Sequence, residues 1–277
     1  MSNLSSSQNP IEQLLELMSR LREPATGCPW DVKQTYQSIA PSTLEEAYEV
    51  VDAIEKQNYP HLKEELGDLL FQVVFYAQLG KEDHYFDFND IVNTLVDKLI
   101  RRHPHVFPDG TLNSRVAIDE NGKAKLDEQA VKKQWDEIKK EEREEKGEKL
   151  LLDDIPVALP AITRATKIQK RASMVGFDWV EVGDVLEKLE EEISELKEAL
   201  EAGNPKEIED EMGDTLFSVV NLSRHLNIEP EKCLRQANDK FERRFNDIEK
   251  SLLQQNKTLE QSSSEEMERL WNEAKKK

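Results

Sequence analysis

The amino-acid sequence predicts an all-α protein built from two tandem copies of one helical bundle. Glycine is scarce, with 10 among 277 residues, and runs of β-branched residues are few, which favours helices over sheets. Apolar residues recur three and four positions apart, the spacing of one face of a helix. In one such stretch they are Val185, Leu186, Leu189, Ile193, Leu196 and Leu200.

Four acidic residues recur in the second half of the chain at a constant offset, which indicates a tandem duplication. Glu46 corresponds to Glu192, so the offset is 192 − 46 = 146 residues. The same offset relates the complete sets, which are Glu46, Glu49, Glu65 and Asp68 in the first copy and Glu192, Glu195, Glu211 and Asp214 in the second. Neighbouring apolar residues keep this offset too, as Phe71 and Phe217 do.

The predicted order begins with a loose Ser/Asn-rich tail over residues 1–9, followed by an N-terminal helical domain over residues 10–146. A linker is expected over residues 147–155, because Gly147 opens it and proline follows it. The second helical domain is expected over residues 156–277, and we expect this copy to be the catalytic one.

Helix starts and turns are predicted inside each copy. Pro41 followed by the pattern Ser42-x-x-Glu45 is typical of a helix N-terminus with a capping box. Tight turns at residues 58–60 and 203–205 separate the two acidic helices of each copy. Short connections of this kind predict antiparallel neighbouring helices.

Two further helical segments distinguish the copies. Residues 128–146 are strongly charged, with Trp135 and Ile138 on one side of the predicted helix. Pro104 is expected to end the helix that contains Arg101 and Arg102, whereas the corresponding helix of the second copy has no proline at this place.

Charge and composition exclude several classes of function. The net charge of −19 disfavours a nucleic-acid polymer as partner, although a small anion accompanied by cations can still bind. No apolar stretch approaches the roughly 20 residues of a membrane span, so no membrane partner is expected. The two cysteines, Cys28 and Cys233, suggest no disulfide framework, and we expect a cytoplasmic protein.

The spacing of the acidic residues predicts a metal site. Glu192 and Glu195 are three residues apart on one helix, and Glu211 and Asp214 are three apart on the next, so each pair shares a helix face. In an antiparallel hairpin the two pairs lie at similar depth and face each other. Four such carboxylates repel at neutral pH, and divalent cations relieve the repulsion. An all-oxygen ligand set favours Mg²⁺, with Mn²⁺ as a substitute.

An ordinary structural explanation competes with this one, since acidic pairs on solvated helix faces are common in so acidic a chain. Two features favour a site over solvated faces. The whole set occurs twice, and a glycine, Gly67 or Gly213, lies inside each second motif, where it weakens the helix unless a close approach needs it.

The acidic motifs, with several others, resemble those of the all-α nucleotide pyrophosphohydrolases, and in particular of the MazG family. The motifs are Gly27-Cys-Pro-Trp-Asp31, Glu65-Leu-Gly-Asp-Leu-Leu-Phe71, Arg101-Arg-His-Pro-His-Val-Phe107, Val175-Gly-Phe-Asp-Trp179, Glu191-Glu-Ile-Ser-Glu195, Glu211-Met-Gly-Asp214 and Lys240-Phe-Glu-Arg-Arg-Phe245. The resemblance covers residues 10–277, and the insertion-like stretch 118–126 differs from the more compact linkers of the family.

This resemblance implies hydrolysis of nucleoside triphosphates (NTPs and dNTPs) to nucleoside monophosphate and pyrophosphate, with Mg²⁺, by a homodimer. It assigns metal-ligand roles to Glu192, Glu195, Glu211 and Asp214, and it associates the activity with the second copy. The first copy retains the corresponding residues, so it offers a second candidate metal site.

Supporting residues are predicted around the second site. Glu191 or Glu192 is the candidate acceptor of a proton from the attacking water. Lys188, four residues before Glu192, is expected to meet a phosphate, as catalytic or nucleotide-binding residue; an ion pair with a neighbouring glutamate is the alternative. Asp214 is expected to contact the nucleotide as well as the metal.

Basic and aromatic residues near the C-terminus are the other candidates for nucleotide binding. Lys240, Arg243 and Arg244 form a basic cluster suited to a triphosphate, unless they line a solvated helix face. Trp271, with Lys275 one turn later, is a candidate lid that stacks on the base, and an anchor in the core is the alternative.

Three other functions remain as alternatives to a general NTP hydrolase. The hydrolase could be a house-cleaning enzyme restricted to modified or non-canonical nucleotides. A dimetal redox protein of the ferritin-like kind requires Glu-x-x-His motifs, which neither acidic helix of the second copy contains. A non-enzymatic acidic scaffold would bind a partner through residues 128–146.

Overall fold

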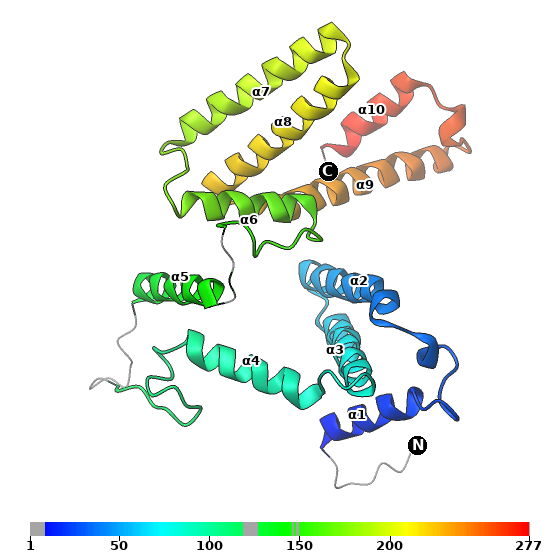
Figure 1. Ribbon diagram of the computed structural model, residues 1–277. Helices are drawn as coiled ribbons and strands as arrows, with labels where there is room; N and C mark the ends of the chain where they lie inside the picture. The colour runs from blue at the N-terminus through cyan, green and yellow to red at the C-terminus, as the bar shows by residue number, and fades with distance from the viewer. Residues whose placement is uncertain (1–8, 119–126, 146, 148–149, 277) are drawn as a thin grey trace. The chain divides into compact units, whose positions relative to one another are not determined.

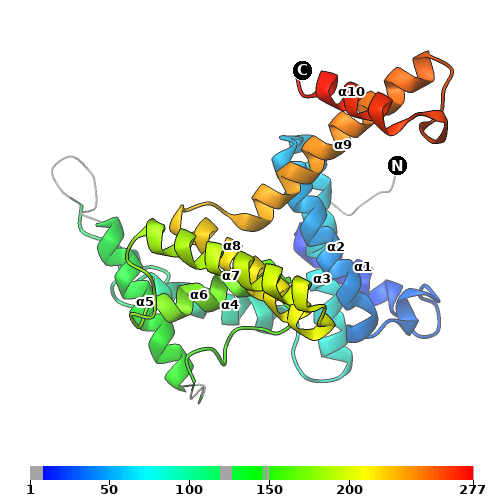
Figure 2. The same ribbon diagram turned by 90° about the horizontal axis from the view of Figure 1, so that it is seen from above.

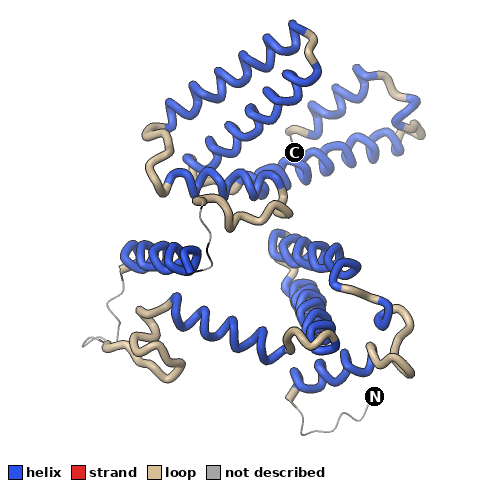
Figure 3. Tube along the Cα trace, in the orientation of Figure 1, coloured by secondary structure: helices blue, strands red, loops and turns tan. Residues whose placement is uncertain are grey.

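The computed structural model describes residues 9–118, 127–145, 147 and 150–276, and within these ranges the regular structure is helical throughout, with no strand (Figure 3). The all-α prediction is therefore confirmed for the described part of the chain. The chain divides into two compact units, Met1–Ile138 and Lys139–Lys277. No described helix has both the length and the apolar character that crossing a membrane requires.

The first unit is organised around an antiparallel pair of helices, α2 and α3 (Figure 1). Helix α1 packs against α3, and α4 follows α3 along the chain. Buried residues from α1, α2 and α3 form the core, namely Met18, Ile39, Val74, Phe75 and Leu79. The helices are α1 (Pro10–Leu21), the 3₁₀ turn η1 (Asp31–Lys33), α2 (Tyr36–Glu55), α3 (Tyr59–Glu82), α4 (Phe88–Arg102) and α5 (Glu128–Glu145), of which α5 extends past the boundary of the unit.

The second unit contains an equivalent antiparallel pair, α7 and α8. Helix α6 packs against α8 and α9, and α10 folds back onto α9 around Ile248, Leu252 and Leu270. The helices are α6 (Ala161–Ser173), α7 (Val182–Ala202), α8 (Pro205–His225), α9 (Pro230–Gln254), the 3₁₀ turn η2 (Leu259–Gln261) and α10 (Ser264–Ala274).

The predicted start of the first acidic helix is wrong. Helix α2 begins at Tyr36, because Thr35 and Ser38 form a reciprocal capping box about two turns before the expected one at Ser42. Pro41 lies inside the helix, not before it. A proline this close to an N-terminus removes one main-chain hydrogen bond and leaves the rest of the helix intact.

The predicted tight turns are confirmed. Helix α2 ends at Glu55 and α3 begins at Tyr59, while α7 ends at Ala202 and α8 begins at Pro205. Asparagine caps the second helix of each pair, and Gly203 has the positive φ of 67° that ends α7 in a left-handed turn. Each pair of acidic helices is therefore a closed hairpin.

The predicted effect of Pro104 is confirmed as well. Helix α4 ends at Arg102, whereas α9 continues to Gln254. The charged helix predicted over 128–146 is observed as α5 over Glu128–Glu145.

Candidate functional site

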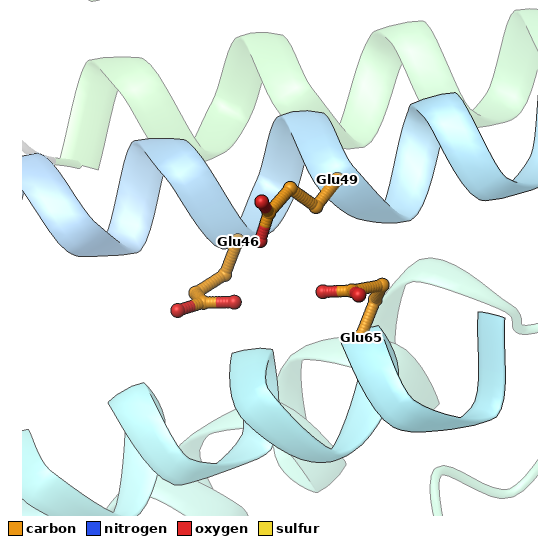
Figure 4. A group of neighbouring side chains, drawn as sticks. All are labelled: Glu46, Glu49 and Glu65. Carbon is orange, nitrogen blue, oxygen red and sulfur yellow. The ribbon is translucent and has the colours of Figure 1, made fainter. Parts of the chain in front are cut away.

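Three glutamates of the first unit converge between α2 and α3. Carboxylate oxygens of Glu46, Glu49 and Glu65 all lie within 4.8 Å of one another, and Figure 4 shows the side chains pointing into the space between the two helices. Glu65 is 6% exposed. Its Oε1 lies 3.0 Å from Nδ1 of His61, and its Oε2 is buried without a hydrogen-bond partner among the described residues.

The second unit repeats this arrangement between α7 and α8. Carboxylate oxygens of Glu192, Glu195 and Glu211 also lie within 4.8 Å of one another. Glu192 is as buried as Glu65, with 6% of its surface exposed. Nζ of Lys188 lies 2.8 Å from Oε1 of Glu192 and 3.1 Å from Oε1 of Glu191.

The fourth carboxylate of each set stands beside the other three. Asp68 and Asp214 are exposed and fall outside the 4.8 Å groups. Both are still close enough to act electrostatically, since Asp68 raises the pKa of Glu46 and Asp214 raises the pKa of Glu211. The structure thus brings together three of the four predicted ligands in each unit and places the fourth at the rim.

The convergence perturbs the acidity of these groups. Desolvation raises the pKa of Glu211 above its usual range, and the negative charges of Glu195 and Asp214 raise it further. Desolvation likewise raises the pKa of Glu46 and of Glu65 in the first unit. Each cluster therefore contains negative charge that the described residues only partly compensate.

The two clusters differ in the side chain that pairs with their most buried glutamate. In the second unit the cation is Lys188, on the same helix as Glu192. The corresponding position of the first unit, 146 residues earlier, is Ser42. In the first unit the side chain beside the cluster is His61 on α3. The residue that corresponds to His61 in the second unit is the acidic Glu207.

The chemistry of both clusters fits a hard divalent cation. Every converging donor is a carboxylate oxygen, which Mg²⁺ and Mn²⁺ prefer and zinc does not. The buried, unpartnered Oε2 of Glu65 and the raised pKa of Glu211 are the two features that such a cation would resolve.

The basic residues predicted to bind the triphosphate are not part of this cluster. They lie on α9, whose neighbours are α6, α8 and α10, and Figure 2 shows α9 and α10 extending away from the α7–α8 hairpin. Lys240 and Arg243 are exposed, and Arg244 is half-buried with its guanidinium carbon 5.7 Å from the ring centre of Trp271.

Trp271 is an anchor between α10 and α9. Its ring lies 5.2 Å from that of Phe241, and it packs against the core formed around Leu252. Nζ of Lys275 stands 5.9 Å from the same ring. The surroundings of Trp271 are therefore those of a core anchor. Its contact with a base stays a prediction.

An ionic clamp at the base of the second hairpin was not anticipated from the sequence. Asp178, before α7, binds the guanidinium of Arg224 through both carboxylate oxygens and lies 2.9 Å from Nε2 of His225, at the end of α8. These bonds lower the pKa of Asp178. Its only sequence signal is the motif Val175-Gly-Phe-Asp-Trp179. In the first unit, Arg22 and Glu82 form a comparable clamp at the end of α3.

The MazG nucleotide pyrophosphohydrolase domain matches the chain twice, over residues 34–107 and 181–248. The chain belongs to the MazG family. Each match contains one complete carboxylate set, which confirms the tandem duplication. Helices α5 and α10 lie outside the two matches.

Curated relatives resemble the chain over nearly its whole length. The nucleoside triphosphate pyrophosphohydrolase of Escherichia coli K12 is 48% identical, over 97% of this chain and 98% of its own. The nucleoside triphosphate pyrophosphohydrolase/pyrophosphatase MazG of Thermotoga maritima is 44% identical, over 96% and 95%. The YabN protein of Bacillus subtilis, which is uncharacterized, is 42% identical over 94% of this chain and 50% of its own. The chain is thus an enzyme of the MazG family, and not a non-enzymatic scaffold.

Removing one charge from the second cluster should stabilise the metal-free protein. Glu211→Gln, at pH 7 with EDTA, is expected to raise Tm by about 2–4 °C, because desolvation and four neighbouring carboxylates disfavour the charged form of Glu211. Thermal denaturation followed by circular dichroism measures the shift. Glu209→Gln, an exposed site on the same helix, is the matched control and should leave Tm unchanged. Equal shifts in the two variants would contradict the repulsion.

Proposed function

We propose that this MazG enzyme hydrolyses NTPs and dNTPs to nucleoside monophosphate and pyrophosphate, and that it does so with Mg²⁺ at the carboxylate cluster of the second unit. The observation that supports the proposal most is the convergence of Glu192, Glu195 and Glu211 beside a lysine. Relatives that are 44–48% identical to the chain are named nucleoside triphosphate pyrophosphohydrolases. A narrower range of modified nucleotides would use the same cluster, because these groups bind metal and phosphate rather than a base.

The proposed metal ligands are Glu192, Glu195 and Glu211, with Asp214 at the rim completing the set. The same role in the first unit falls to Glu46, Glu49, Glu65 and Asp68. When bound, Mg²⁺ or Mn²⁺ neutralises phosphate charge and makes a bound water more acidic. The carboxylates hold their positions because two rigid helices, closed by a tight turn, set the distance between them.

Lys188 positions the acidic groups around this centre. Its ammonium holds Glu192 and Glu191 together, and these bonds keep the pKa of Lys188 well above its usual range, so the lysine stays charged. Glu191 is exposed and lies outside the converging trio. It is therefore better placed than Glu192, which faces the metal, to accept the proton of the attacking water. A triphosphate that approaches would find the ammonium of Lys188 at the edge of the cluster.

The remaining nucleotide contacts are assigned to the basic residues of α9 and to α10. We propose that Lys240, Arg243 and Arg244 neutralise the triphosphate and that Trp271 contacts the base, with Asp214 at the junction between metal and nucleotide. The chain has 38 Lys and Arg against 57 Asp and Glu, so a group of three basic residues on one helix is a local exception to its acidic character and would attract an anion.

A homodimer is proposed from an apolar groove of about 760 Å³ on the second unit, formed by α6, α8 and α9. Leu216 and Leu234 line it and are 60% and 50% exposed. A side chain at Gly213, which also lines it, would meet no atom within 4 Å. A second copy of the chain, presenting the same apolar face, would cover it.

Both cysteines are free, which accords with the reducing cytoplasm where we propose the enzyme acts.

The activity assay compares matched glutamates of the two units. Wild-type protein with ATP or dNTPs and Mg²⁺ should release monophosphate and pyrophosphate, and EDTA should abolish release. Glu192→Gln should lower kcat by at least about 100-fold, because it removes a ligand and the partner of Lys188. Glu46→Gln, the matched change in the first unit, should lower kcat by less than about threefold. Release of diphosphate and phosphate, or equal losses in both variants, would refute the proposal.

The dimer is tested by placing a charge in the groove. Leu216→Glu should convert the protein to monomers in sedimentation velocity at micromolar concentration, because two carboxylates would meet across the interface. Glu209→Gln, on the same helix, serves as control and should leave the dimer intact. A monomeric wild-type protein, or a dimeric Leu216→Glu variant, would show that the groove is not the interface.

A further inference from the structure

The duplication extends beyond the two matched domains into the helices that follow them. Helix α5 contains Gln134-Trp-Asp-Glu-Ile-Lys139, and the end of α10 has the similar segment Leu270-Trp-Asn-Glu-Ala-Lys275, in which Lys275 is the C-cap. The tryptophans are 271 − 135 = 136 residues apart, and the lysines one turn later keep the same offset, 275 − 139 = 136. Both segments therefore contain Trp-x-x-x-Lys, and the tryptophan of the second segment is the residue that we propose contacts the base.

The tryptophan of each unit has a ring contact with a residue in or directly after a basic segment. That segment is Lys98, Arg101 and Arg102 in the first unit and Lys240, Arg243 and Arg244 in the second. The ring of Trp135 lies 6.1 Å from that of His103, the residue that follows Arg102. In the second unit Arg244 lies over Trp271. Trp135 is 40% exposed, so one part of its ring is open to solvent.

The carboxylate cluster of the first unit contains a buried oxygen without a partner in the described part of the chain, which is a feature of ligand sites. Glu65 is 6% exposed, and its Oε2 has no hydrogen-bond partner among the described residues although it is buried. The side chain of Glu65 extends from α3 into the space that Glu46 and Glu49 enter from α2 (Figure 4). A buried anionic oxygen without a donor is costly, and a bound cation satisfies it.

One position separates the two units chemically. Lys188 bonds to Glu192 at 2.8 Å in the second unit, and its counterpart in the first unit is Ser42. His61 does not replace it, because it reaches Glu65 from α3 and not Glu46 from α2. The first unit therefore keeps the groups for a cation, a triphosphate and a base, but it lacks the ammonium at the edge of the carboxylates.

From these four observations we propose that the first unit binds a nucleoside triphosphate together with a divalent cation and retains it without hydrolysis, as a second, non-catalytic nucleotide site. The ligand chemistry rests on the function proposed for the second unit, since it is the internal repeat that transfers it. The occupancy of such a site would depend on the nucleotide concentration and not on the rate of hydrolysis.

The test is the stoichiometry of nucleotide binding to the full chain. Isothermal titration calorimetry with Mg²⁺ and α,β-methylene-ATP, whose carbon bridge prevents release of pyrophosphate, should give two nucleotides per wild-type chain. The double variant Glu46→Gln/Glu49→Gln should bind one, and Glu192→Gln/Glu195→Gln should bind one. Glu55→Gln, at the exposed end of α2, is the matched control and should bind two. Circular dichroism establishes that each variant is folded.

The outcomes separate this proposal from the function proposed for the second unit. One nucleotide per wild-type chain, lost in Glu192→Gln/Glu195→Gln and unchanged in Glu46→Gln/Glu49→Gln, would overturn the second site and leave the hydrolase assignment intact. No binding at all would overturn both. Release of monophosphate from ATP by Glu192→Gln/Glu195→Gln at the wild-type rate would overturn retention without hydrolysis.

Discussion

The mutual repulsion of carboxylates gathered between two antiparallel helices is the constraint on which the rest of this structure depends. Three glutamates in each unit bring their oxygens within 4.8 Å of one another, two of them from one helix and one from the next. An isolated hairpin would open to separate such charges. The hairpins stay closed because other contacts hold them: asparagine-capped turns at one end, and at the other the pairs Asp178–Arg224 and Arg22–Glu82. The proposed function uses the same repulsion, since a divalent cation bound between the carboxylates would relieve it.

The two units place different side chains beside their carboxylates, and this is how the two copies of the site have diverged. In the second unit a permanently charged lysine lies beside the cluster on the same helix, and the bonds to two glutamates fix it there. In the first unit a serine takes that position and a histidine from the opposite helix faces the most buried glutamate. The carboxylates are the same in both units, so the proposed division into a catalytic and a binding unit depends on the groups beside them.

Much of this architecture could be predicted from the sequence, because it depends on local signals. Periodicity, turn residues and the 146-residue repeat are sufficient for the hairpins and for the convergence of three glutamates. Pro41 misled the prediction of one helix start because the stronger cap, Thr35 with Ser38, lies upstream of it. The Asp178 clamp was missed because its partner is 46 residues away, and no pattern within a helix reports such a distance. The basic residues of α9 could be named but not placed, since their position depends on packing between helices and not on spacing.

The central claim, that the carboxylates of the second hairpin hold a divalent cation, is tested most directly by electron paramagnetic resonance of Mn²⁺. Free Mn²⁺ gives a sharp six-line signal that weakens when the ion binds, so a titration counts bound ions per chain without reference to activity. Replacing Glu192 and Glu211 together with glutamine should remove the ions bound at the second unit and leave the rest of the isotherm in place. An isotherm identical to that of the wild-type protein would contradict the claim, because the cation would then be held by other groups.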